Sequence, residues 1–275
     1  MCLIAFDWRP GHDRPLVMAA NRDESYERPT AAAGWWPGAS EVYGGRDLLA
    51  GGSWLAMDRG GRLAAVTNVR EAQPVLGRRS RGELVSGFLL GELDLHDYAQ
   101  QVADAADDYS GFNLLLFETR GEGRAFYVSN RAPVRLAPVP AGVHGLSNHL
   151  LDTDWPKVRR LVRRLADATD STQPLEAALL QALADRELPP DDELPDTGVG
   201  AERERLLAPA FIYGPARSYG TRASTVVVVD RDGTDYIERS WRPGAEGPVE
   251  AGTVRARIQP GAARCMRTCA MPTSS

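Results

Sequence analysis

The sequence predicts an α+β fold whose sheets are antiparallel. Strand-like apolar runs occur in pairs separated by short turns, and the helical segments are grouped between these pairs. No glycine-rich loop with the spacing of a phosphate-binding or dinucleotide-binding site joins a strand to a helix. Strands connected by tight turns pair antiparallel, so this order of elements favours antiparallel sheets over alternating βαβ units.

The strand-like segments form hairpins along most of the chain. We expect strands or hairpins at 2–8, 15–21, 53–68, 112–130, 142–148 and 223–241. Helices are expected from Ser80, over 95–108, and twice within 155–187, where apolar residues recur at helical spacing. In the first helix Ser80 would be the N-cap, and Glu83 would complete a capping box.

The chain is expected to form one domain over residues 1–243. After Pro243 large apolar residues become rare, so residues 244–275 are expected to be a flexible C-terminal tail. Cys265 and Cys269 of this tail have a C-x-x-x-C spacing, but no histidine or further cysteine lies close by. A structural zinc site needs four ligands, so no metal site is predicted.

Composition narrows the function classes. The 275 residues carry 32 basic and 37 acidic side chains, a net charge of -5, which argues against a nucleic-acid partner. No apolar run approaches the ~18 residues of a membrane span, and the N-terminus lacks a signal-peptide pattern. Three cysteines are too few for a disulfide framework and suit a reducing compartment. We therefore expect a cytoplasmic protein that binds a small molecule, whereas its oligomeric state is left open.

The second residue is a candidate nucleophile. Removal of the initiator methionine would leave Cys2 with a free α-amine beside its thiol. The amine has a pKa of ~7.7–8.0 and the thiol one of ~8.5, so the amine can accept the thiol proton near neutral pH. The alternative is an inert cysteine packed in an edge strand.

Several motifs occur together in a fixed order. The segments "MCLIAF", "ANRDES", "GGRDLLAGGSWLA", "AVTNVR" and "YGTRASTVVVVD" extend from residue 1 to about residue 230. Together they resemble the NRDE family, also called the transport and Golgi organisation protein 2 family. That family resembles the N-terminal nucleophile hydrolases, close to penicillin V acylases and conjugated bile acid hydrolases. The resemblance implies a four-layer αββα sandwich and no required cofactor.

The resemblance also implies five catalytic residues. Cys2 matches the nucleophile, and Asp23 matches an aspartate that holds the α-amine. Asn68 and Asn148 match two asparagines near the oxyanion site, where amide donors stabilise developing charge. Arg222 matches an arginine that faces the nucleophile and lowers the thiol pKa. The alternatives are that both asparagines cap strand ends and that Arg222 flanks a hairpin in solvent.

Asn21, Arg22 and Trp54 are the candidate substrate-binding residues. Strand alternation would place Asn21 and Asp23 on one face, and Arg22 and Glu24 on the other. The related acylases carry an arginine three residues before the aspartate, whereas here the arginine directly precedes Asp23. Arg22 can therefore enter the pocket or serve as a structural ion-pair partner. Trp54 can wall the pocket or pack in the core.

Two functions are compatible with these residues. The first is an N-terminal cysteine nucleophile hydrolase that acts on an amide or related acyl bond of a small molecule. The second follows from links of the family to haem trafficking and to lipid or acyl-CoA handling. In that case the pocket would carry haem or an acyl-CoA as a bound ligand without turnover. Fold alone does not separate the two, because function depends on the site.

Overall fold

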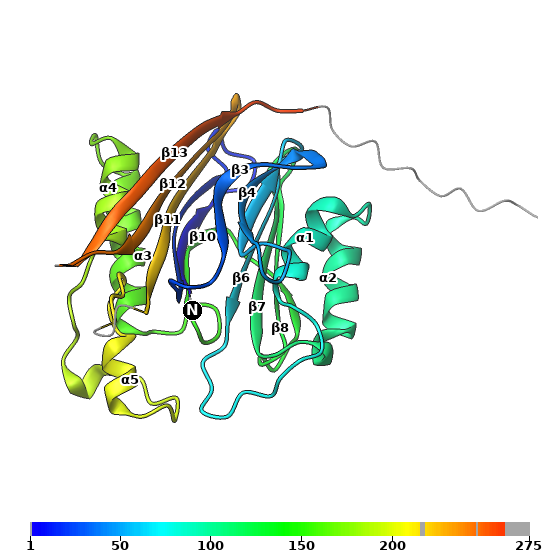
Figure 1. Ribbon diagram of the computed structural model, residues 1–275. Helices are drawn as coiled ribbons and strands as arrows, with labels where there is room; N and C mark the ends of the chain where they lie inside the picture. The colour runs from blue at the N-terminus through cyan, green and yellow to red at the C-terminus, as the bar shows by residue number, and fades with distance from the viewer. Residues whose placement is uncertain (1, 215–217, 246, 262–275) are drawn as a thin grey trace, which may run out of the picture.

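Two antiparallel sheets pack face to face and carry helices on their outer surfaces (Figure 1). The computed structural model describes residues 2–214, 218–245 and 247–261. The layers follow one another as helices, sheet, sheet and helices, so the predicted α+β fold and its αββα sandwich are confirmed.

The first sheet has six strands in the order β10-β1-β2-β11-β12-β13. Their bounds are β1 Cys2–Trp8, β2 Leu16–Ser25, β10 Gly142–Leu146, β11 Tyr219–Asp230, β12 Gly233–Pro243 and β13 Pro248–Ile258. The expected hairpins of residues 2–21 and 223–241 are both part of this sheet. The β2–β11 pairing connects these two distant segments of the chain and is interrupted by a register shift between Thr221 and Ala223.

The second sheet has seven strands in the order β3-β4-β5-β6-β7-β8-β9. Their bounds are β3 Thr30–Trp36, β4 Ala39–Asp47, β5 Leu55–Asp58, β6 Arg62–Asn68, β7 Phe112–Glu118, β8 Arg124–Ser129 and β9 Leu136–Pro138. The strands follow chain order, so each pairs with its sequence neighbour. The hairpins expected at 53–68 and 112–130 correspond to β5–β6 and β7–β8.

The helices cover the two outer faces. Their bounds are α1 Gly82–Leu90, α2 Leu95–Asp104, α3 Pro156–Thr169, α4 Leu175–Leu183 and α5 Ala201–Leu206. Helices α1 and α2 cover the second sheet, and α3 and α4 cover the first (Figure 1). The expected cap of α1 is only half correct. The Ser80 N–H donates to the Glu83 carboxylate at 3.3 Å, but the N-cap residue is Arg81, without a side-chain cap.

Strand alternation divides the apolar residues of β1 between two cores. Ile4, Phe6 and Trp8 face the second sheet, and Leu3 and Ala5 face α3 and α4. The Phe6 and Trp8 rings each lie 5.4 Å from the Phe117 ring of β7, which joins the two sheets. Even-numbered positions of β1 therefore point between the sheets, and Cys2 is one of them.

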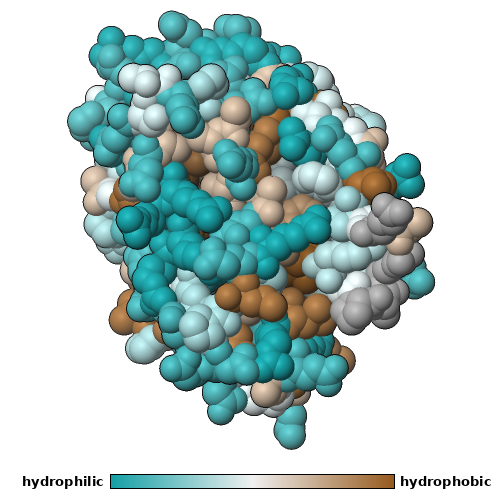
Figure 2. All heavy atoms as spheres, turned by 90° about the vertical axis from the view of Figure 1, so that its left-hand side faces the viewer, coloured by the Kyte–Doolittle hydropathy of each residue, from teal (hydrophilic) through white to brown (hydrophobic). Residues whose placement is uncertain are grey.

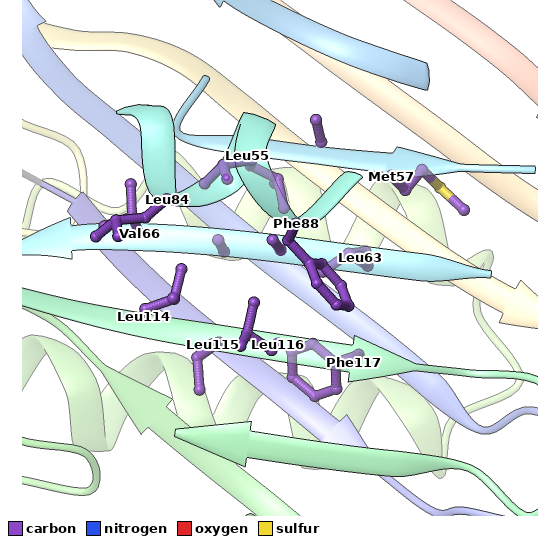
Figure 3. Close-up of a cluster of buried hydrophobic side chains, with 14 of the residues drawn as sticks. Leu55, Met57, Leu63, Val66, Leu84, Phe88, Leu114, Leu115, Leu116 and Phe117 are labelled. Atoms are coloured by element: carbon purple, nitrogen blue, oxygen red, sulfur yellow. The ribbon is translucent and has the colours of Figure 1, made fainter. Parts of the chain in front are cut away.

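The second sheet also buries both of its faces. Figure 3 shows Leu84 and Phe88 of α1 lying over β5 and β6, with successive side chains of β7 pointing to opposite sides. By contrast, the outer surface over α3 and α4 is mostly hydrophilic (Figure 2). Arg160 and Arg164 of α3 both lie within ion-pair distance of Asp185 there.

Residues after Pro243 differ in part from the expected tail. The structure places β13 at Pro248–Ile258, paired with β12 at the edge of the first sheet. Its first half is mostly exposed, and only Val254, Ala256 and Ile258 pack against the apolar core, so the apolar alternation is too short to predict the whole strand. Residues 262–275, with Cys265 and Cys269, lie outside the described residues. Among the described helices, none is long and apolar enough to cross a membrane.

Candidate active site

A cavity of about 680 Å³ opens beside the start of β1. Its wall comes from β1, β2, β11, β12 and β13 of the first sheet, from β3, β4 and β6 of the second, and from the segment before α1. The cavity thus lies where the ends of both sheets meet, and Cys2 is part of its wall.

Cys2 and Arg22 lie side by side on this wall. They are direct partners in the β1–β2 register, and paired residues of antiparallel strands project from the same face. Both side chains are buried. Burial raises the pKa of the Cys2 thiol, and the positive charge of Arg22 acts against this rise. The direction differs from the lowered thiol pKa that the family resemblance implied, because desolvation disfavours the thiolate.

Arg22 combines the two roles that the sequence left open. Its guanidinium lies 3.6 Å from the Glu24 carboxylate and donates to the Thr30 hydroxyl at 3.5 Å. It also lines the cavity on the same face as Cys2. The arginine is therefore a cavity residue that an ion pair holds in place.

Asn21 and Asp23 share the opposite face of β2, as alternation predicted, and this face packs against the helices. The Asn21 amide donates to the carbonyls of Leu183 and Ala210, both at 2.8 Å, and accepts from the Ser224 hydroxyl at 2.7 Å. Asn21 is not among the described residues that line the cavity. The structure therefore does not bring it to a substrate, and it instead fixes β2 to the helical layer.

Asp23 is buried, and the Thr221 hydroxyl contacts its carboxylate. The Thr221 hydroxyl donates to the Asp23 carboxylate at 2.7 Å and accepts from the Ile212 N–H at 2.9 Å. Burial raises the pKa of Asp23, and positive charges oppose the rise, first that of the N-terminal amine and then that of Lys157. Asp23 also contributes to the cavity wall. The Asp23 carboxylate thus belongs to the residue directly after Arg22, the strand partner of Cys2.

The two asparagines lie at different depths. Asn68 ends β6 on the cavity wall. The Asn148 amide donates to the Asn68 carbonyl at 3.0 Å and is not among the described lining residues. The Ser147 hydroxyl donates to the Cys2 carbonyl at 3.0 Å. The two residues directly after β10 thus hold the start of β1 and the end of β6. Asn68 therefore lies on the cavity wall, and the Asn148 amide holds its backbone from behind.

Arg222 and Trp54 also line the cavity. The Arg222 guanidinium donates to the carbonyls of Ser25 at 2.8 Å and Arg28 at 3.1 Å, so part of its donor capacity braces the turn after β2. Burial lowers the pKa of Arg222. Trp54 is buried and belongs to the apolar core as well as to the wall, which combines its two predicted roles.

Among the wall residues that were not predicted from the sequence are Glu238 and Arg81. Glu238 of β12 is buried, and its carboxylate accepts from the Ala33 N–H at 2.7 Å. Burial raises the pKa of Glu238, against the charge of Arg22. Arg81 donates to the Gly111 carbonyl, and burial lowers the pKa of its guanidinium. The only sequence signal for either of these two residues is the alternation of β12, which places Glu238 on the same face as Tyr236.

Comparison with known sequences decides the family. The family model described as Transport and Golgi organisation 2 matches residues 1–243. The chain belongs to this family. The homologue of Transport and Golgi organization protein 2 from Bos taurus is 38% identical over 94% of this chain and 100% of its own length. The human homologue is 35% identical over 87% of this chain and 93% of its own length.

A solved structure shares the fold of this Transport and Golgi organisation 2 family member. A mutant of conjugated bile acid hydrolase from Clostridium perfringens aligns with a TM-score of 0.50, over 93% of this chain and 92% of that one. The sequence identity is 8%, so the likeness shows the N-terminal-nucleophile type of fold and nothing about activity. In the described part of the chain, no group of three or more His, Cys, Asp and Glu residues could hold a metal ion.

Among the side-chain cations of the cavity, Arg22 rather than Arg222 acts on Cys2. We expect Arg22→Met to raise the pH midpoint of Cys2 labelling by iodoacetamide, because the variant lacks a positive charge that stabilises the thiolate. The matched change Arg222→Met removes the same charge from the same wall and should shift the midpoint less. Both are measured with Cys265 and Cys269 replaced by alanine. An equal or larger shift in Arg222→Met would contradict this assignment.

Proposed function

We propose that this protein is a hydrolase of the N-terminal nucleophile type that cleaves an amide or related acyl bond of a small molecule. The observation that carries the proposal is the position of Cys2. It is the second residue, it lies on the wall of a cavity of about 680 Å³, and its strand partner is a buried arginine. The likeness to a conjugated bile acid hydrolase supports a hydrolytic use of the fold by analogy only.

The reaction would begin after removal of Met1. The free α-amine of Cys2 takes the thiol proton, and the thiolate attacks the carbonyl carbon of the substrate. The developing oxyanion would be stabilised by donors on the wall, of which Asn68 is the candidate. The protonated amine returns its proton to the leaving amine as the carbon–nitrogen bond breaks. Water then cleaves the thioester, which releases the acid and restores Cys2.

The cavity favours a substrate that carries negative charge. Its described lining includes seven arginines and four carboxylates. Arg28 pairs with Asp47, and Arg22 with Glu24. Arg81 and Arg222 instead donate to backbone carbonyls, so their charge is not neutralised by these contacts. Arginine is well suited to carboxylate and phosphate groups, so we include an anionic group in the proposed substrate.

The alternative function is a carrier of haem or of an acyl-CoA or lipid without turnover. It is favoured by the pKa of the Cys2 thiol, which burial raises and which makes the thiolate less available. The same arginines would then bind the carboxylates or phosphates of the cargo. In this case Cys2 would be a residue of the pocket wall and would not act as a nucleophile.

Intact-protein mass spectrometry separates the two functions. Purified protein is incubated with a p-nitrophenyl acyl ester, an activated acyl donor. The hydrolase predicts a chain that begins at Cys2 and gains the mass of one acyl group, located by peptide mapping on Cys2. Full retention of Met1 on folded protein from cells, or acylation confined to other residues, would refute the hydrolase.

A further inference from the structure

Lys157 is the only lysine among the 32 basic residues of the chain. It lies in the first turn of α3, and it is 2% exposed. Lysine and glutamate side chains are almost never fully buried unless they are paired. A chain that otherwise uses arginine throughout therefore places its one lysine in the interior, on the side of the first sheet that carries Asp23.

The Lys157 ammonium is part of a hydrogen-bonded system that reaches Asp23. Segment 207–212 is held by three polar side chains. Lys157 donates to its first carbonyl at 3.0 Å, Asn21 donates to its Ala210 carbonyl, and Thr221 accepts from its last N–H. The Thr221 hydroxyl in turn donates to the Asp23 carboxylate. One short segment thus connects Lys157 to the carboxylate that follows Arg22.

Among the charged groups around Lys157, Asp23 is the main negative one. The groups that act on it are Arg70 from the segment after β6, Asp23 from β2, Cys2 from β1 and Glu204 from α5, and Tyr219 of β11 lies next to Asp23. Arg70 and Glu204 form a buried ion pair with each other. Their charges compensate in part, and Asp23 is then the group that most favours the charged form of Lys157.

We propose that Lys157 is a positioning residue for the N-terminal amine: its ammonium group keeps Asp23 ionised, and Asp23 holds and orients the amine of Cys2. The second half of this statement rests on the proposed hydrolase function. The first half concerns only the electrostatic interaction between two buried side chains.

A lysine at this position adds a titration that an arginine would not. Burial lowers the pKa of Lys157 to about 8, and Arg70 acts in the same direction, whereas Asp23 opposes it. Arginine stays charged at every pH of interest, but a buried lysine loses its proton within the working range. Lys157 is therefore expected to be charged at neutral pH and to release Asp23 from its influence above pH 8.

The single lysine allows a direct test. Protein grown with lysine labelled with ¹³C at Cε gives one resonance, whose shift against pH reports the protonation of Lys157. In Asp23→Asn we expect the midpoint to fall by about 1 unit or more, because an opposite charge nearby has been removed. The control is Glu238→Gln, which removes a buried carboxyl from the cavity face of the same sheet and should leave the midpoint nearly unchanged. An unchanged midpoint in Asp23→Asn would overturn the proposal.

Activity profiles test the functional half. Lys157→Arg keeps the charge and should move the alkaline fall of hydrolysis to higher pH, while Lys157→Met should lower kcat about tenfold or more at neutral pH. A structural lysine would change melting temperature in both variants without moving the profile, which would overturn the positioning role. If Lys157→Met fails to fold, the Asp23→Asn midpoint still decides the pairing. A shifted midpoint with no hydrolysis by the wild type would refute the proposed function and support the pairing.

Discussion

Replacing Cys2 with serine is expected to reduce acyl-adduct formation on the order of 100-fold or more, because a hydroxyl is hardly ionised near neutral pH. The exchange keeps nearly the same volume at a buried position, so the fold and the cavity should persist. Binding of the same acyl compound should therefore stay within about twofold of the wild type, since binding depends on the walls. Mass spectrometry gives the adduct, and equilibrium binding gives the affinity.

The same variant identifies a carrier. If neither protein forms an adduct, and haem or an acyl-CoA binds both equally, Cys2 is a wall residue and the hydrolase is refuted. Binding should then fall on replacing Arg22, whose guanidinium lines the cavity. A haem Soret band that shifts in Cys2→Ser, without an adduct in the wild type, would identify Cys2 as an axial ligand. Both proteins carry alanine at positions 265 and 269, so that no other thiol reacts.

Strand alternation predicted which residues of the "NRDE" segment share a face, but not which face carries the cavity. Asn21 and Asp23 do lie opposite Arg22. The cavity side depends on the pairing of Cys2 with Arg22, which involves a second strand and its register. A pattern within one strand contains no information on that register, and this is why Asn21 was placed at the substrate.

The least predictable elements are those without a strong apolar pattern. Strands β3 and β4 consist largely of alanine, glycine and polar residues, which have low strand propensity, and their burial alternates poorly. They are formed because neighbouring strands of the second sheet pair with them and because the Glu238 carboxylate accepts from the Ala33 N–H. Long-range partners of this kind are not visible in a single sequence.

Replacing Arg70 with methionine is expected to cost about 3–5 kcal/mol of unfolding free energy, because it leaves a buried carboxylate without its countercharge. Arg70 pairs with Glu204, 134 residues away, and each side chain is 3% exposed. The guanidinium also lies 4.7 Å from the Trp155 ring. At roughly 2–4 °C per kcal/mol, the melting temperature should fall by about 10 °C.

The control for this loss is Arg79→Met, which breaks an ion pair of the same residue types at the surface. Arg79 and Glu83 are 48% and 44% exposed, and such pairs contribute about 0–1 kcal/mol. The double variant Arg70→Met/Glu204→Leu should regain part of the lost stability, because both buried charges are gone. Glu204 also accepts from the Thr197 N–H at 2.9 Å, so the regain should be incomplete.

A melting temperature for Arg70→Met equal to that of Arg79→Met would mean that water reaches Glu204. The helical layer behind Asp23 would then be too wet for the Lys157 charge to act on that carboxylate with the strength proposed.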